Sequence, residues 1–160
     1  MKKSLQFAIN ECQIKITKEE IEIILHSCES FLFSRGEAWV KKGENGPFDI
    51  PMGSYSGAES CELCGLCILH KLTSGPRPIF TKKQVGLYKD DGLAHIPEKG
   101  QSSRELIRQI KKVFGDVDLE ITTDSGLKKD DFLDVVLDLP LTENQMTPLF
   151  TLMSILTTHQ

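Results

Sequence analysis

Two short apolar runs enclose a polar centre between residues 84 and 96, in the stretch QVGLYKDDGLAHI. The centre ends in Asp91-Gly92, a dipeptide that favours the tight turns joining antiparallel strands. The pattern therefore predicts a β-hairpin over 84–96 with Asp90 and Asp91 at its tip. Both runs are apolar enough to be buried, so this hairpin is expected to form the centre of the fold.

The other elements are predicted from apolar periodicity and from capping patterns. Helices are expected over 4–13, after Thr17, over 58–72 and after Ser102, the last three opened by Ser/Thr-x-x-Glu. Strands are expected on both sides of a turn at 34–37, over 119–124 and over 132–139, and a loop over 43–54. The chain should therefore be α+β, with an antiparallel sheet built on the central hairpin and the two following strands, and helices on one face.

Composition limits the class of protein. The chain has 160 residues, of which 39% are hydrophobic and 26% charged, which is typical of one folded domain. No apolar run approaches the roughly 20 residues of a membrane-spanning helix, and no signal peptide is evident, so an intracellular protein, cytoplasmic or nuclear, is expected. The net charge of −4 argues against a freestanding nucleic-acid binder, but it is compatible with a metal-dependent catalytic core.

The paired carboxylates of Asp90 and Asp91 have two interpretations. Asp is common in turns, where its side chain bonds nearby backbone amides. At the tip of buried strands, however, two adjacent carboxylates repel each other unless a cation neutralises them, and their hard oxygen ligands suit Mg²⁺. Phosphoryl transfer by two metals places the ions about 3.5–4 Å apart, so it needs a further carboxylate from another strand.

Four blocks of the sequence carry a resemblance to a known family. Tyr88-Lys89-Asp90-Asp91 resembles the YxDD signature of reverse transcriptases, and Met52-Gly53-Ser54 with the next predicted helix resembles the loop-helix motif that contacts template and nucleotide there. SFLFSRGEAWVKK lies where these enzymes place a short hairpin. LEITTDSGLKKDDFLDVVLDL resembles the segment ending in FLDV in Penelope-like elements and related retroelement polymerases.

The resemblance implies that residues 1–139 form part of a reverse-transcriptase palm, followed by a divergent tail or short terminal helix over 140–160. The parent enzyme would be an RNA-directed DNA polymerase of a mobile element, acting on a template-primer and deoxynucleoside triphosphates. Its implied site residues are Asp90 and Asp91 as ligands of Mg²⁺ (or Mn²⁺), Tyr88 near the primer end, and Met52, Gly53 and Ser54 at the template-nucleotide contact.

Two departures from the family pattern limit this expectation. Tyr55-Ser56-Gly57-Ala58 stands where many relatives have Pro-Leu-Ser-Pro. The family also carries its first catalytic Asp on a strand upstream of the first helix, and Asp49, Asp134 and Asp138 do not match that motif. The fingers are missing and the thumb is at best a remnant. The isolated chain is therefore expected to be inactive, and the alternative function is that of a non-catalytic remnant or interaction module.

A second cluster, Cys61-x-x-Cys64-x-x-Cys67-x-x-His70, suggests a metal-binding regulator as a weaker alternative. On a helix, each step of three residues rotates the side chain by roughly 60°, so four ligands at this spacing cannot converge on one ion. Cysteine also packs as a small apolar side chain. The cluster is therefore predicted to be core on a largely buried helix, and the odd total of five cysteines indicates reduced thiols.

Overall fold

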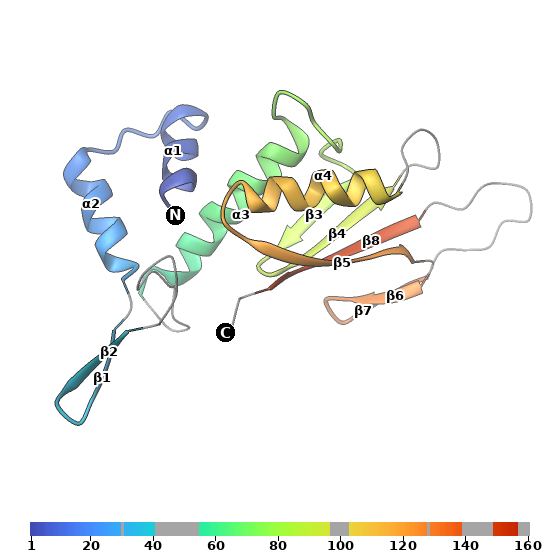
Figure 1. Cartoon of the computed structure of the whole chain (residues 1–160). Helices are drawn as coiled ribbons and strands as arrows, with labels where there is room; N and C mark the ends of the chain where they lie inside the picture. The colour runs from blue at the N-terminus through green and yellow to red at the C-terminus, as the bar shows by residue number, and fades with distance from the viewer. Residues whose placement is uncertain (30, 41–54, 97–102, 128, 139–148, 157–160) are drawn as a thin grey trace, which may run out of the picture. The chain divides into compact units, whose positions relative to one another are not determined.

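The computed structural model describes residues 1–29, 31–40, 55–96, 103–127, 129–138 and 149–156. These residues form an α+β structure (Figure 1). The helices are α1 (Lys2–Asn10), α2 (Lys18–Ser27), α3 (Gly57–Thr73) and α4 (Ser103–Gly115). The strands are β1 (Phe31–Ser34), β2 (Glu37–Val40), β3 (Val85–Tyr88), β4 (Asp91–Ile96), β5 (Glu120–Leu127), β6 (Lys129–Phe132), β7 (Val135–Asp138) and β8 (Leu149–Leu156). The chain divides into two compact units, Met1–Cys67 and Ile68–Gln160.

The first unit begins with two helices and a hairpin. The start of α2 confirms the predicted capping box: the Glu20 N–H donates to Thr17 Oγ1 (3.2 Å), and the Thr17 N–H donates to Glu20 Oε2 (2.8 Å). Strands β1 and β2 pair antiparallel, as expected around the turn at 34–37. The turn residues Arg35 (φ 55°) and Gly36 (φ 81°) are both left-handed, which matches the twist of a two-residue hairpin loop.

Few large side chains are buried in the described part of this unit. Leu5 and Ala8 of α1 are buried, and the buried Ser4 hydroxyl donates to Cys64 Sγ at 3.3 Å. The apolar side chains of Ile21, Ile24 and Leu25 on α2 are only half-buried, whereas Cys28, just after the helix, is buried. The first unit is therefore held by a small interior.

The second unit is built on a four-stranded antiparallel sheet in the order β3-β4-β8-β5. Strands β3 and β4 form a hairpin within the predicted range of 84–96. The central strand β8 pairs with β4 on one side and with β5 on the other. Because β3 and β5 are the outer strands, the hairpin is anchored to the rest of the sheet through β4.

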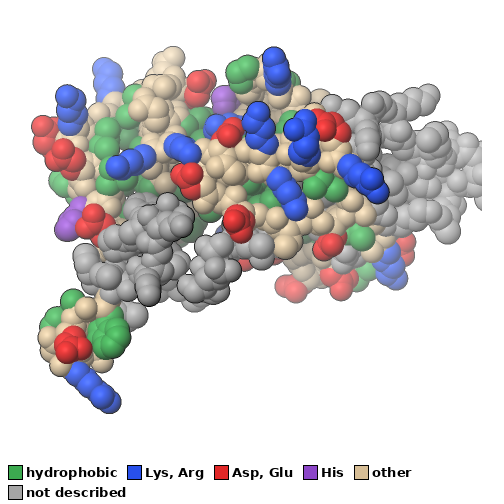
Figure 2. Space-filling view, in the orientation of Figure 1, with side chains coloured by type: hydrophobic (Ala, Val, Ile, Leu, Met, Phe, Trp, Pro, Cys, Tyr) green, Lys and Arg blue, Asp and Glu red, His purple; other side chains and the backbone are tan. Residues whose placement is uncertain are grey.

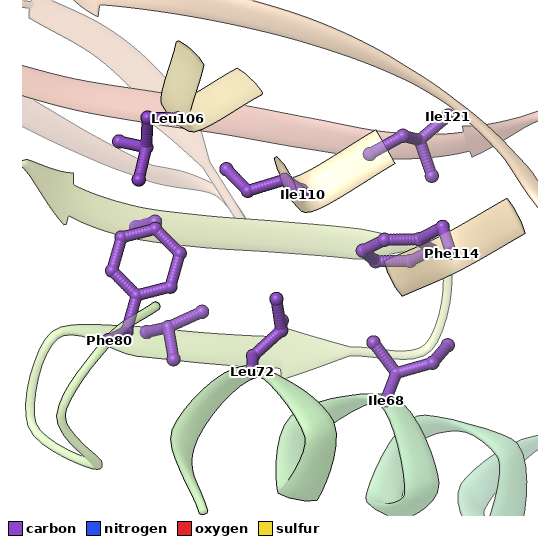
Figure 3. Close-up of a cluster of buried hydrophobic side chains, with 9 residues drawn as sticks. Ile68, Leu72, Phe80, Leu106, Ile110, Phe114 and Ile121 are labelled. Carbon is purple, nitrogen blue, oxygen red and sulfur yellow. The ribbon is translucent and has the colours of Figure 1, made fainter. Parts of the chain in front are cut away.

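The core of this unit lies between the sheet and the helices α3 and α4 (Figure 3). Its buried side chains come from α3, β3, β4, α4 and β5 and from the segment between α3 and β3: Ile68, Leu72, Phe80, Val85, Ala94, Leu106, Ile110, Phe114 and Ile121. Leu106, Ile110 and Phe114 recur at the four-residue spacing of one helix face, which explains why α4 turns this face inward. The core therefore fixes both strands of the hairpin against both helices.

The strand predicted over 132–139 is wrong. Residues 129–138 form the separate β6–β7 hairpin, in which Phe132 pairs with Val135. The two turn residues are Leu133 (φ 50°) and Asp134 (φ 63°). A continuous strand cannot contain two consecutive left-handed residues, so FLDVVLDL reverses direction after its first residue instead of joining the main sheet.

The C-terminal segment also differs from the prediction. Residues 149–156 form strand β8 rather than a terminal helix, and they take the place in the sheet that the prediction gave to 132–139. Six of these eight residues are apolar (LFTLMSIL), a composition that suits a strand with neighbours on both sides. Part of the predicted tail therefore belongs to the second unit.

None of the described helices has both the length and the apolar composition needed to cross a membrane.

The charge pair on the outer face of α4 gives a prediction for pH titration. The Arg108 Nε–H and Nη2–H donate to the two Glu105 carboxylate oxygens at 2.8 and 2.7 Å, and Gln109 Nε2 donates at 3.0 Å. These hydrogen bonds, that of Arg108 first, lower the pKa of Glu105 from 4.5 to about 2. NMR titration of the Glu105 carboxyl should give this value, and Arg108→Ala should return it toward 4.5.

The sign of the linked stability effect follows from this lowered pKa. The folded pKa of Glu105 lies below its unfolded value, so its contribution to stability is complete above the unfolded pKa. The contribution is lost as the pH falls through about 2. A Glu105 pKa that stays the same in Arg108→Ala would show that Arg108 is not its cause.

The β6–β7 turn gives a second prediction. Leu133 is 42% exposed, so its side chain contributes little packing, while its left-handed backbone costs about 1–2 kcal/mol. Leu133→Asn should relieve part of this strain, because Asn tolerates that conformation. Amide hydrogen exchange in residues 129–138 should slow by about fivefold, the equivalent of about 1 kcal/mol. Asp134→Asn, at an equally left-handed position, serves as the control and should change exchange little.

Candidate functional site

The predicted site residues Asp90 and Asp91 lie together at the turn of the β3–β4 hairpin. Tyr88 is the last residue of β3 and pairs with Asp91, the first residue of β4, so Lys89 and Asp90 are the two turn residues. Lys89 has φ 53°, a left-handed backbone that a two-residue turn of this kind requires at its first position. The turn is therefore Lys89-Asp90, one residue before the predicted tip of Asp90 and Asp91. Gly92, part of the Asp-Gly signal, is a buried residue of β4.

The alternation of side chains along the strands decides which face the site occupies. Val85 and Ala94 are buried beneath α3 and α4. Residues an odd number of positions away from them, Tyr88 and Asp91, therefore lie on the other face of the sheet. Asp91 is half-buried and Asp90 is exposed. The two carboxylates are thus adjacent, accessible, and carried by a hairpin whose opposite face is packed in the core.

Tyr88 is also accessible beside them. Its side chain is 53% exposed, and Lys89 Nζ lies 5.4 Å from the centre of its ring. This distance is within the range of a cation–π contact. An exposed aromatic ring next to the turn can pack against a bound molecule, and Lys89 places a positive charge beside that ring.

The strand that borders Asp91 carries no carboxylate. In the register of the sheet, Asp91 pairs with Ser154 of β8, and Ser154 pairs with Thr122 of β5. The eight residues of β8 include no Asp or Glu. Among the described residues, no group of three His, Cys, Asp or Glu side chains is placed to hold a metal ion. Asp90 and Asp91 are therefore two adjacent carboxylates without a third such side chain grouped with them in this part of the chain.

The remaining acidic candidates lie elsewhere. Asp134 is a turn residue of the β6–β7 hairpin, and Asp138 on β7 forms an ion pair with Lys129 at 3.7 Å. That hairpin is a separate two-stranded sheet, so neither residue is paired next to Asp91. Four predicted residues lie outside the described part of the chain: Asp49, Met52, Gly53 and Ser54.

Ser154 is the neighbour of the site that the sequence prediction missed. The segment 149–156 has the local signal of a buried strand, a short and nearly continuous apolar run that follows Pro148. That signal identifies a strand without giving its partners. The pairing of Ser154 with Asp91 depends on register across the sheet, which no local pattern specifies.

The cysteine cluster is spread around α3. Cys61 is exposed, Cys64 is half-buried and Cys67 is fully buried. This graded exposure is what the rotation of roughly 60° at each step of three residues produces. The prediction that all three are core residues is therefore right for Cys67 and wrong for Cys61, and Leu66 on the same helix is 57% exposed.

Comparisons with known proteins add no relative. No model of a protein family matches this chain, and neither a curated protein nor a solved structure does. Inference about function therefore rests on the sequence motifs and on the geometry of the β3–β4 turn.

The register at the turn predicts that a single substitution creates a stronger cation site. Ser154→Asp would place a second carboxylate opposite Asp91, with the two Cβ atoms about 5 Å apart. Mn²⁺ should then bind at least about tenfold more tightly than to the unchanged chain, since close carboxylates are neutralised by a shared cation. Paramagnetic broadening of the Gly92 amide signal in NMR spectra measures this binding.

The matched control is Phe150→Asp, which adds the same charge on the same face of β8 but opposite His95, about 13 Å along the strand. This variant should leave Mn²⁺ binding at the turn unchanged. Adding Asp91→Asn to Ser154→Asp should remove the gain. Equal binding by Ser154→Asp and Phe150→Asp would contradict the pairing of Ser154 with Asp91.

Proposed function

We propose that this chain is part of the palm of an RNA-directed DNA polymerase of the reverse-transcriptase type. The observation that supports the proposal is the position of Tyr88-Lys89-Asp90-Asp91, a YxDD sequence, at the turn of a core-anchored hairpin. In the intact parent enzyme the substrates would be a template-primer and deoxynucleoside triphosphates. Met52, Gly53 and Ser54, which lie outside the described residues, would contribute the template-nucleotide contact that the resemblance implies.

The surroundings of the turn suit a catalytic role. Catalytic groups need to be held on rigid elements, and both strands of the hairpin pack against the helices that flank it in the chain. The strained Lys89 backbone also fits, because conformations of this kind recur at active sites. The β1–β2 and β6–β7 turns contain left-handed residues too, so strain alone does not distinguish the site.

The two carboxylates are compatible with one divalent cation bound together with substrate phosphates. Mg²⁺ takes hard oxygen ligands and usually keeps only one or two carboxylates beside phosphate and water. When bound, such ions stabilise the attacking and leaving oxygens of phosphoryl transfer. The role of Asp90 and Asp91 would be to hold that cation at the nucleotide phosphates, while Tyr88 would position the primer end beside them.

The strand β8 favours a second candidate, a non-catalytic remnant or interaction module. Ser154 is the residue of β8 that pairs with Asp91, and the sequence of β8 contains no Asp or Glu. Two-metal catalysis requires carboxylates from more than one strand, so the described part of the chain does not complete the site by itself. The proposed catalytic role consequently belongs to the parent enzyme, which would add the missing strand.

Primer extension tests the proposal. The 160-residue chain should extend no primer with Mg²⁺ or Mn²⁺, because only one strand supplies carboxylates to the turn. A fusion that adds a related upstream segment with the Asp strand and fingers, and a thumb, should be active. Asp90→Asn should then abolish synthesis, since the amide keeps the shape but loses the charge that binds the cation.

Asp116→Asn, at an exposed position after α4, is the matched control in the same fusion and should retain activity. Synthesis by the unfused chain would show that its own carboxylates suffice, and Asp49, Asp134 and Asp138 would then be the first to mutate. A folded fusion in which Asp90→Asn is as active as the parent fusion would refute the proposed role of the turn.

A further inference from the structure

Charge is strongly segregated along the second unit. Residues 71–112 contain ten Lys and Arg against four Asp and Glu, whereas residues 116–138 contain two against eight. Residues 71–112 are therefore basic although the whole chain has a net charge of −4. A local excess of this kind determines which charged partners a surface attracts, independently of the total.

The basic side chains of α4 form one stripe on its outer face. Arg104, Arg108, Lys111 and Lys112 are all exposed. At about 100° per residue, they fall within an arc of about 100° on the side away from Leu106, Ile110 and Phe114. Figure 2 shows Lys and Arg side chains gathered over the region of α4, with few Asp and Glu among them.

Three of these four cations are available to a partner. Arg108 is engaged by Glu105, whose two carboxylate oxygens accept from it at 2.7 and 2.8 Å. In the described part of the chain, no ion pair involves Arg104, Lys111 or Lys112. The rise of a helix separates Arg104 from Lys111 by about 10 Å, so the two ends of the stripe can meet different charges of an extended polyanion.

The buried face of α4 distinguishes between polyanions. A helix that binds an anionic membrane inserts its apolar face into the lipid. Here that face is occupied, since Ile110 and Phe114 have no exposed surface and Leu106 is 3% exposed. The phosphate backbone of a nucleic acid needs no apolar anchor and is contacted by Lys and Arg side chains. The outer stripe therefore fits a nucleic-acid backbone better than a lipid surface.

We infer that Arg104, Lys111 and Lys112 on the outer face of α4 bind the phosphate backbone of a nucleic acid, without regard to its sequence. This contact is made by α4 and not by the β3–β4 turn, and it requires no metal ion. It goes beyond the proposed polymerase function, because a chain that never catalyses synthesis would still bind. Glu105 limits the strength of the contact by neutralising Arg108.

Fluorescence anisotropy with a labelled 16-base-pair RNA–DNA duplex tests the inference on the full chain. The triple variant Arg104→Gln, Lys111→Gln, Lys112→Gln keeps good helix formers in α4, and circular dichroism verifies its fold. It should bind at least about tenfold more weakly than the unchanged chain at about 50 mM salt, and the slope of log K against log salt should fall by about 3.

The matched control removes the same charge from exposed lysines of the first unit, in Lys2→Gln, Lys15→Gln, Lys18→Gln. This variant should bind within about twofold of the unchanged chain. Equal weakening in both triple variants, or no binding by the unchanged chain, would overturn the inference. Binding to phosphatidylserine vesicles but not to the duplex, lost in the α4 variant, would also overturn it in favour of a membrane surface.

Glu105→Gln supplies an independent test in the opposite direction. It removes a negative charge beside the stripe and releases Arg108 to reach a phosphate. Duplex binding should strengthen by about threefold, and the salt slope should increase by about 1. Glu19→Gln, which removes an exposed acid from α2, is the control. If the Glu105→Gln variant bound the duplex no more tightly than the Glu19→Gln variant, the assignment of the contact to this stripe would be overturned.

Discussion

The burial of α3 and α4 against the β3–β4 hairpin is the interaction on which the second unit depends. Phe114, Ile110 and Leu72 are fully buried side chains of this core, and Ala94 of β4 lies beneath them with no exposed surface. A small residue at that position lets the helices approach the strand closely. The same packing that stabilises the unit also fixes the direction of the hairpin, so the core holds the strands that carry the two carboxylates.

The parts of the fold that depend on neighbouring residues could be predicted from the sequence. The capping box of Thr17 and Glu20 and the hairpin within 84–96 are of this kind, since each arises from residues a few positions apart. The turn lies one residue before the predicted tip, at Lys89-Asp90 instead of Asp90-Asp91, because Asp-Gly is a strong turn signal and a left-handed Lys is unusual. Propensity identified the hairpin, whereas the pairing of its strands decided where it turns.

The parts that depend on distant pairing could not be predicted. The run FLDVVLDL has a strand-like composition, and nothing in it indicates that Leu133 and Asp134 are left-handed. The neighbour of Asp91 was missed for the same reason, since Ser154 lies more than fifty residues further along the chain. The chemistry of the turn depends on that neighbour. A motif can therefore suggest a metal-dependent function. Only the register of the sheet shows which other residues lie beside the motif and could act as ligands.

The central position of β8 has a consequence for how the second unit is made. Strands β4 and β5 both pair with β8, so each keeps an open hydrogen-bonding edge until residues 149–156 have been synthesised. Ribosomes add about 5–20 residues per second, so the edge of β4 stays unpaired for several seconds until β8 has been synthesised. During that interval the nascent chain presents an unpaired strand to other chains and to chaperones. The sheet is therefore most vulnerable to misassembly before β8 has been synthesised, because β4, which carries Asp91, lacks its second neighbour until then.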